Sequence, residues 1–314
     1  MNTFHTLIKF LPLFISLLCT YCTLAQKEQE NGFKEVILTS TNADNRYASY
    51  NKKGTKIVFE SNRDGHWQIY TMNIDGSSQK QLISSDSNDR RPKWHPTKNL
   101  ILFESDRTGI NEIYSFNLDS NTIKQYSINL NGNKYNADFA PNGVQLIFSH
   151  PENKDVSNIY TCSTKGKRLK KVISNNYKNK YPNLSPRGDA IIYFSNKNTQ
   201  GETNIIYTYN LYNKDKKRLS YFKNESTFPR WSNKNSRRIV YSAKVDDILH
   251  SEIFIMHNDG THKTRITYNN LEDTLPNWSP NNVNLLITGF RNGNYQICKI
   301  LLKEPLNPNQ KPLE

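Results

Sequence analysis

Short apolar runs alternate with polar segments along nearly the whole chain. Six runs rich in β-branched and aromatic residues recur, namely KIVFES, LILFES, QLIFSH, AIIYFS, RIVYSA and NLLITG. A polar hairpin and a second run follow each of them, namely WQIYTM, NEIYSF, SNIYTC, NIIYTY, SEIFIM and YQICKI. Runs of this length bounded by turn residues are typical of strands, and no segment shows a convincing helical period. The pattern predicts an all-β chain.

The runs belong to an internal repeat with one aromatic or apolar anchor per unit. The anchors are Tyr50, Trp94, Phe139, Leu184, Trp231 and Trp278, at spacings of 44, 45, 45, 47 and 47 residues. A third polar hairpin, such as NIDG (73–76) or HNDG (257–260), precedes a last strand in five units. Asp-Gly supplies the positive φ of tight hairpins. Repeats of about 40–45 residues with four strands are typical of β-propeller blades.

The sixth unit lacks its last strand, and the N-terminus offers a replacement. EVILTS (35–40) is similar in character to KQLISS (80–85) of the first unit. We expect this N-terminal strand to complete the last blade, because ring closure removes exposed sheet edges. The sequence thus predicts one six-bladed β-propeller over residues 35–303. Cys162 and Cys298 fall in second runs of opposite blades, so we expect both to be unpaired.

The repeat resembles the WD-like propeller repeat of the TolB type. The resemblance rests on residues 44–76 and 88–119, and on LPNWSPNN with FRNGNYQI in the last unit. It implies a six-bladed propeller of the bacterial periplasm that binds a protein partner. TolB carries an α/β domain before its propeller, whereas about ten residues, QKEQENGFKE, separate the predicted signal from the first strand here. We therefore expect a propeller without that domain, which leaves a Tol-type role open.

The N-terminal residues have the pattern of a secretory signal. FLPLFISLLCTYC is apolar, and TLA ends at Ala25 with small residues at the −1 and −3 positions, which predicts cleavage after Ala25. Residues 26–34 form a short linker, and residues 304–314 a C-terminal tail. Lipidation at Cys19 or Cys22 is the alternative. We expect a periplasmic or secreted protein, without a transmembrane span and monomeric.

Charge adds a basic character but does not by itself select a partner. Without Lys9 of the signal, 41 Lys and Arg face 28 Asp and Glu, a formal charge of +13. The runs KGKRLKK (165–171) and KDKKR (214–218) fall in outer hairpins of adjacent blades and predict one basic edge. Export argues against nucleic acid as a partner, whereas anionic envelope glycan or lipid headgroups are alternatives. Lys on outer strands also has a plain structural explanation, because it discourages edge-to-edge association.

Catalytic motifs are scarce in the chain. GxSxG, the nucleophile elbow of α/β-hydrolases, does not occur. The histidines of the mature chain recur at no common blade position; they are His66, His95, His150, His250, His257 and His262. His95, beside an anchor, is the residue on which we centre an alternative hypothesis of a carbohydrate-active lyase or hydrolase. We expect no cofactor and no metal.

Several recurrent hairpin residues have a structural explanation. Asp64, Asp75 and Asp259 precede Gly, where Asp tolerates turn geometry. Arg63, Arg107 and Arg291 recur at comparable hairpin positions. We expect these arginines to form cross-blade ion pairs or hydrogen bonds to neighbouring turns, because recurrence in repeats indicates architecture.

Residues that depart from the repeat predict a binding face. The loops leading to the anchors should open together at one mouth of the ring. Basic residues cluster there in blades one to four, and Glu225, Glu272 and Asp273 provide an acidic gap in the last two. The candidate contacts are Arg46, Tyr47, Arg90, Arg91, Lys134, Tyr135, Lys180, Tyr181 and Phe228. Tyr and Arg are favoured in interface hot spots. The main hypothesis is a non-catalytic propeller that holds an envelope protein or an anionic glycan at this face.

Overall fold

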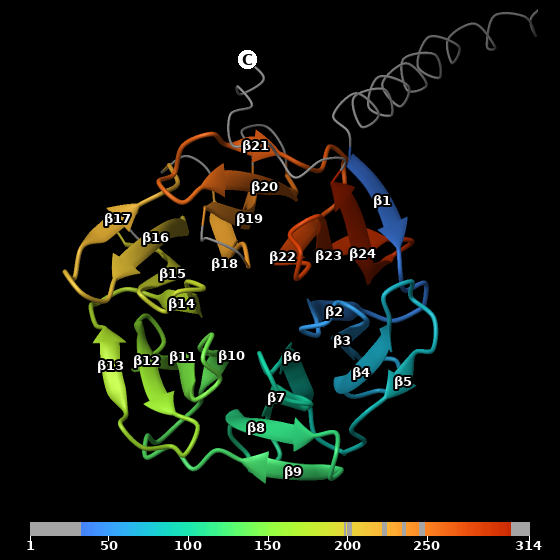
Figure 1. The fold of residues 1–314 in the computed structure, drawn as a ribbon, viewed down its shortest axis with the longest axis horizontal. Helices are drawn as coiled ribbons and strands as arrows, with labels where there is room; N and C mark the ends of the chain where they lie inside the picture. The colour runs from blue at the N-terminus through green and yellow to red at the C-terminus, as the bar shows by residue number, and fades with distance from the viewer. Residues whose placement is uncertain are drawn as a thin grey trace, which may run out of the picture.

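The fold is a ring of sheets around a central axis (Figure 1). The computed structural model describes residues 33–302 except 198, 200–202, 222–224, 234–236 and 245–248. Within these residues, 24 strands form six four-stranded antiparallel sheets, and no helix is present. The predicted all-β, six-bladed propeller is therefore confirmed.

Each blade has its innermost strand at the axis and its outermost strand at the rim (Figure 1). The first three blades consist of β2 (Asn45–Tyr50), β3 (Lys56–Ser61), β4 (Gln68–Asn73) and β5 (Lys80–Gln81); β6 (Asp89–Trp94), β7 (Leu100–Ser105), β8 (Glu112–Asn117) and β9 (Thr122–Gln125); and β10 (Tyr135–Phe139), β11 (Gln145–Pro151), β12 (Ser157–Ser163) and β13 (Lys170–Ile173). The last three consist of β14 (Asn179–Leu184), β15 (Ala190–Ser195), β16 (Ile205–Asn210) and β17 (Lys216–Arg218); β18 (Ser226–Trp231), β19 (Arg238–Lys244), β20 (Ser251–His257) and β21 (Thr264–Arg265); and β22 (Asp273–Trp278), β23 (Asn284–Arg291), β24 (Asn294–Leu302) and β1 (Phe33–Ile37).

The N-terminal strand closes the ring, as the sequence predicts. β1 pairs antiparallel with β24, with Phe33 opposite Leu302 and Ile37 opposite Cys298. The pairing continues past the strand, where the Leu38 amide donates to the Ile297 carbonyl at 2.8 Å. The last blade is thus built from both ends of the described chain, and β1 supplies the outermost strand that completes its four-stranded sheet.

Apolar side chains fill the space between neighbouring blades. Six buried clusters lie at the six blade interfaces; the one between blades two and three contains Leu102, Ile113, Phe139 and Phe148. Each cluster joins residues from two sheets, so a single blade could not bury its faces alone. Cys162 and Cys298 are buried and free, which confirms the expectation that they are unpaired. Burial raises the pKa of the Cys162 thiol to about 11.

The recurrent hairpin arginines bind within their own blades, which corrects the expected cross-blade contacts. Arg107 pairs with Asp89 of β6 at 2.8 Å, and Arg291 pairs with Asp273 of β22 at 2.8 Å. Both carboxylates are fully buried at the start of innermost strands. The arginines reach inward because the hairpin between the second and third strands returns to the same end of the sheet where the innermost strand begins. Arg291 also pairs with Glu35 of the closing strand at 2.8 Å.

Every innermost strand carries a β-bulge three residues before its anchor. The residues there have positive φ without being glycine: Tyr47 (57°), Arg91 (51°), Asn136 (56°), Tyr181 (52°), Phe228 (51°) and Leu275 (53°). The register of each pair shifts at this point, as between Arg46 and Ser49. A bulge changes the direction of a side chain and is common beside functional sites. Recurrence in all six blades makes it part of the architecture, and the side chains it presents differ from blade to blade.

Candidate functional site at the mouth of the ring

Two tyrosines from opposite blades meet across the axis at the predicted mouth. The hydroxyls of Tyr47 in β2 and Tyr181 in β14 are hydrogen-bonded. Their rings are nearly parallel, 5° apart, with centroids separated by 6.4 Å. Burial, followed by the neighbouring Tyr47, raises the pKa of Tyr181. The pair narrows the channel at this end of the ring.

Arg91 lies beside this pair and joins it to the neighbouring blades. Its guanidinium carbon is 5.4 Å from the centroid of Tyr47 and 5.8 Å from that of Tyr135. Its Nη1 donates to Glu104 Oε2 at 2.6 Å. Burial alone would lower the pKa of Arg91, but Glu104 and the two channel tyrosines raise it above its ordinary value. The structure thus brings four of the predicted contacts together at the axis.

Arg46 and Arg90 share one aromatic ring at the mouth. Arg46 stacks on Trp67 with 3.8 Å between its guanidinium carbon and the ring centroid, and it pairs with the buried Glu60 at 3.0 Å. Arg90 approaches the same indole at 5.7 Å. These guanidinium groups therefore stabilise the local fold, and replacing Arg46 by Glu would place two carboxylates together.

Lys134 lies inside the protein rather than at the surface. Its side chain is fully buried, and its ammonium group donates to Glu112 Oε1 at 2.8 Å and to the Gly132 carbonyl at 2.9 Å. Asp273 is likewise buried against Arg291. A partner reaches neither side chain. The charge at this face is therefore distributed differently from the sequence expectation, because sequence spacing does not reveal which charges are paired internally.

The accessible part of the face is a cavity of about 530 Å³ between blades four, five and six. We call it the mouth basin and define it by Lys178, Lys180, Tyr181, Phe194, Glu225, Phe228 and Glu272. Aromatic rings pack against one another on its floor: Phe228 meets Tyr181 edge-on with 4.5 Å between ring centroids, and Tyr181 stacks on Phe194 at 5.3 Å. Lys180 is exposed at the rim. Burial, then Lys178 and Arg91, lower the pKa of Lys180.

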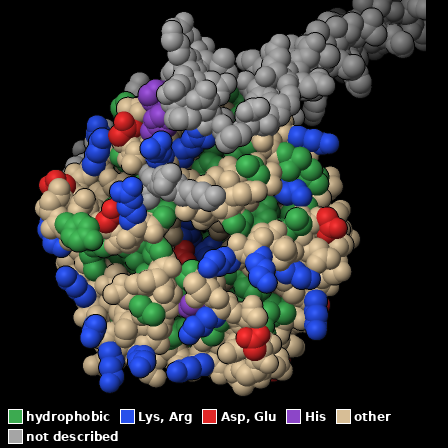
Figure 2. All heavy atoms as spheres, in the orientation of Figure 1, with side chains coloured by type: hydrophobic (Ala, Val, Ile, Leu, Met, Phe, Trp, Pro, Cys, Tyr) green, Lys and Arg blue, Asp and Glu red, His purple; other side chains and the backbone are tan. Residues whose placement is uncertain are grey.

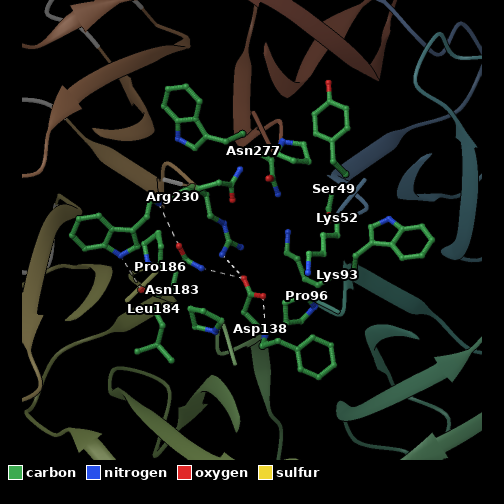
Figure 3. Close-up of a pocket in the computed structure, with 18 of the residues that line it drawn as sticks. Ser49, Lys52, Lys93, Pro96, Asp138, Asn183, Leu184, Pro186, Arg230 and Asn277 are labelled. Atoms are coloured by element: carbon green, nitrogen blue, oxygen red, sulfur yellow. Dashed lines mark hydrogen bonds and ion pairs between the residues drawn. The ribbon is translucent and has the colours of Figure 1, made fainter. Parts of the chain in front are cut away.

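A second cavity of about 490 Å³ lies on the axis at the other end of the innermost strands (Figure 3). The residue directly before each anchor lines it: Ser49, Lys93, Asp138, Asn183, Arg230 and Asn277. The space-filling view shows a hollow at the centre of the ring with acidic and basic side chains in it (Figure 2). None of these six residues is among the contacts predicted from the sequence. The available signal was a polar residue before the anchor in all six repeats, on the side opposite to the anchor by strand alternation.

His95 also borders this axial cavity, but both of its ring nitrogens are occupied. Nε2 donates to the Gly143 carbonyl at 3.0 Å, and Nδ1 accepts from the amides of Thr97 and Lys98 at 3.1 Å. Burial lowers the pKa of His95. The ring therefore ties two hairpins together. Among the described residues, no three His, Cys, Asp or Glu side chains are placed to hold a metal ion together.

The fold is a six-bladed propeller whose ring is closed by the N-terminal strand. The family model of the TolB beta propeller domain matches residues 34–235, which is more than half of the chain. The chain therefore belongs to the TolB beta propeller domain family. No curated protein matches it. In the described part of the chain, no helix is long and apolar enough to cross a membrane.

Solved structures with a similar fold include TolB proteins and a lyase. A protein of Agrobacterium tumefaciens described as a TolB is 14% identical with a TM-score of 0.65, and the match covers 86% of this chain and 96% of that one. TolB from Acinetobacter baumannii is 18% identical with a TM-score of 0.60, covering 84% and 65%. An oligogalacturonate lyase in complex with manganese is 12% identical with a TM-score of 0.58, covering 87% and 94%. At these identities the similarity shows a shared fold.

Proposed function

We propose that the chain is a non-catalytic binding protein of the cell envelope that holds a protein partner at the mouth basin. The observation that carries this proposal is the composition of the basin. Packed aromatic rings form its floor, and both lysines and the carboxylates of Glu225 and Glu272 line it. Aromatic residues are enriched at protein interfaces, and Tyr in particular at their hot spots, with a polar rim around them.

A protein partner fits this basin better than an anionic glycan does. A polymer of one charge sign would be attracted by Lys178 and Lys180 but repelled by Glu272, which lines the same cavity. The other carboxylate, that of Glu225, is already paired with Lys244 at 3.8 Å. A protein segment can present both charge signs and an apolar side chain at once. The predicted signal supports a periplasmic or external location, and residues 1–25 lie outside the described residues.

The alternative of a carbohydrate-active enzyme has less support. It was centred on His95, whose ring nitrogens are both engaged in local hydrogen bonds. A general acid or base must reach the substrate proton directly or through one water. The shared fold with the lyase does not transfer its activity, because a propeller scaffold hosts many functions.

The test compares two charge reversals of equal size on different surfaces. Lys180→Glu reverses an exposed charge of the mouth basin, whereas Lys165→Glu does so on the outer basic edge. The immobilised mature chain captures its partner from the envelope extract of its own cells, and the purified partner is then titrated. We expect Lys180→Glu to weaken binding by at least about tenfold, and Lys165→Glu to leave it unchanged.

The opposite ranking would place the partner on the outer edge and overturn the proposal. Capture of a polysaccharide in place of a protein would favour the glycan alternative. Both variants should retain the melting temperature of the parent chain, because both lysine side chains are exposed.

A further inference from the structure

The six residues directly before the anchors form a ring of polar side chains around the axis. All six lie at the same position of the repeat and line one cavity of about 490 Å³ (Figure 3). A cavity of this size accommodates a small molecule but not a folded domain. The chemistry of the six differs between the two halves of the ring.

Blades three, four and five form a closed network. Arg230 Nη1 donates to Asp138 Oδ2 at 2.6 Å, and Asn183 Nδ2 donates to the same oxygen at 3.4 Å. Asn183 Oδ1 in turn accepts from the Trp231 amide at 3.4 Å. The single carboxylate of the ring is therefore already neutralised and hydrogen-bonded by its own neighbours.

The polar side chains that blades six, one and two contribute to the ring have no protein partner within the described part of the chain. The side chains of Asn277, Ser49 and Lys93 form no hydrogen bond or ion pair with any described residue, although Lys93 is only 8% exposed. Lys52 projects toward the same space from the hairpin after β2 (Figure 3). The cavity thus holds the cations Lys52, Lys93 and Arg230 against the one carboxylate of Asp138.

The Lys93 side chain is mostly buried and its ammonium group lies at the cavity without a carboxylate partner among the described residues, and partial desolvation of an unpaired charge is energetically costly. Burial, followed by the charge of Arg230, lowers the pKa of Lys93 to about 7. An anion in the cavity would remove this cost, because it would give the ammonium a charge-assisted hydrogen bond. Asn277 and Ser49 provide further hydrogen-bond donors beside it.

We propose that the axial cavity binds a small oxyanion-bearing molecule, whose carboxylate or phosphate group contacts Lys93, Ser49 and Asn277. Arg230 and Asp138 are held by their mutual ion pair, so the side chains without a partner in the described chain, on the other half of the ring, are the ones that contact the ligand. This site lies at the opposite end of the innermost strands from the mouth basin, so partner capture and anion binding can succeed or fail independently.

Isothermal titration calorimetry of the mature chain at pH 6.5 and constant ionic strength tests the proposal. The probes are inorganic phosphate and D-glucuronate, with D-glucose as the uncharged match of the second. We expect saturable binding of at least one anion and none of D-glucose. Binding of phosphate alone identifies a phosphate group as the ligand, binding of D-glucuronate alone a carboxylate, and binding of both a site for either oxyanion.

Variants distinguish a site from general attraction by a basic protein. Lys52→Glu places a carboxylate at the cavity, whereas the adjacent, equally exposed Lys53→Glu lies outside the lining. We expect Lys52→Glu and Lys93→Met to weaken binding by about tenfold or more, and Lys53→Glu to have no effect. Lys93→Met changes a buried residue. If this variant does not fold, the comparison of Lys52→Glu with Lys53→Glu tests the proposal by itself. Equal weakening by these two, or no saturable binding of either anion, overturns the proposal.

Discussion

Replacing Arg291 by Met tests whether the ring is closed by an ion-paired seam in the last blade. Arg291 joins Glu35 of β1 to Asp273 of β22, with 2.8 Å contacts to both. Asp273 has a fully buried side chain and would retain one hydrogen bond, from Asn269 Nδ2 at 2.7 Å. Breaking a buried pair by removing one partner costs about 3–5 kcal/mol, and we expect that loss in the free energy of unfolding at pH 8.

The loss of unfolding free energy in Arg291→Met should be smaller at low pH, because Asp273 becomes protonated there. Burial raises the pKa of Asp273 to about 6 even though Arg291 lowers it, so the pKa is higher still without the arginine. A carboxyl with a raised folded pKa contributes stability at low pH, and this contribution is lost as the pH rises through that pKa. At pH 5 the variant therefore holds a neutral Asp273, and the cost falls to that of the lost hydrogen bonds, about 1–2 kcal/mol.

Urea unfolding at pH 5 and pH 8 measures both values. The double variant Arg291→Met with Asp273→Asn serves as the control, because it removes the unpaired carboxylate. It should be more stable than the single variant at pH 8 and show little difference between the two pH values. A loss below about 1 kcal/mol at pH 8, or the same loss at both pH values, would refute the argument.

Two further predictions concern the hairpins and the axial lysine. Gly166 and Gly188 have φ of 73° and 72°, but an added methyl group at Gly166 would overlap the Ser127 carbonyl oxygen, whereas Gly188 has open space around it. In urea unfolding, Gly188→Ala should lower the free energy of unfolding by about 1 kcal/mol, and Gly166→Ala by at least about 2 kcal/mol more. Equal losses in the two variants would contradict the close packing of Gly166 against Ser127. The charged groups around the Lys93 ammonium are Arg230, Lys52, Asp138, Glu60 and Glu104. The pKa of Lys93 is about 7 in the folded chain, against an ordinary value of 10.5. Between these two pH values the lysine is protonated in the unfolded chain and mostly neutral in the folded one. Stability of the parent chain should therefore rise relative to Lys93→Met from pH 7 to pH 9.5, and parallel pH curves would show that Lys93 is not desolvated.

The repeat made the architecture predictable. The six anchors indicate six blades. Only five of the units contain a fourth strand, so the sixth blade needs a strand from elsewhere, and EVILTS at the N-terminus provides it. The free cysteines followed from the same alignment, since equivalent strands of opposite blades lie apart. Tyr47, Arg91 and Tyr181 lie together because all innermost strands begin at one face, a consequence of the repeat that the alignment of the anchors makes visible.

What the sequence could not provide was the pairing of charges in three dimensions. Lys134 is buried against Glu112, 22 residues away, and only the packing of blades two and three brings them together. The bulges were also hidden, because Tyr, Arg, Phe and Leu rarely adopt positive φ and Asn136 alone is a residue type that favours it. The sequence shows that the residue before each anchor is polar. It does not show that three of these residues are hydrogen-bonded to one another while the other three are not, because this depends on contacts across the axis.

Photo-cross-linking in cells tests the binding face most directly. A benzophenone amino acid is placed at Phe228 in the mouth basin or at Tyr212, which is 81% exposed in the outer hairpin of blade four. The account predicts one discrete protein adduct from position 228, reduced by Lys180→Glu, and none from position 212. An adduct from position 212 with none from position 228 would contradict it.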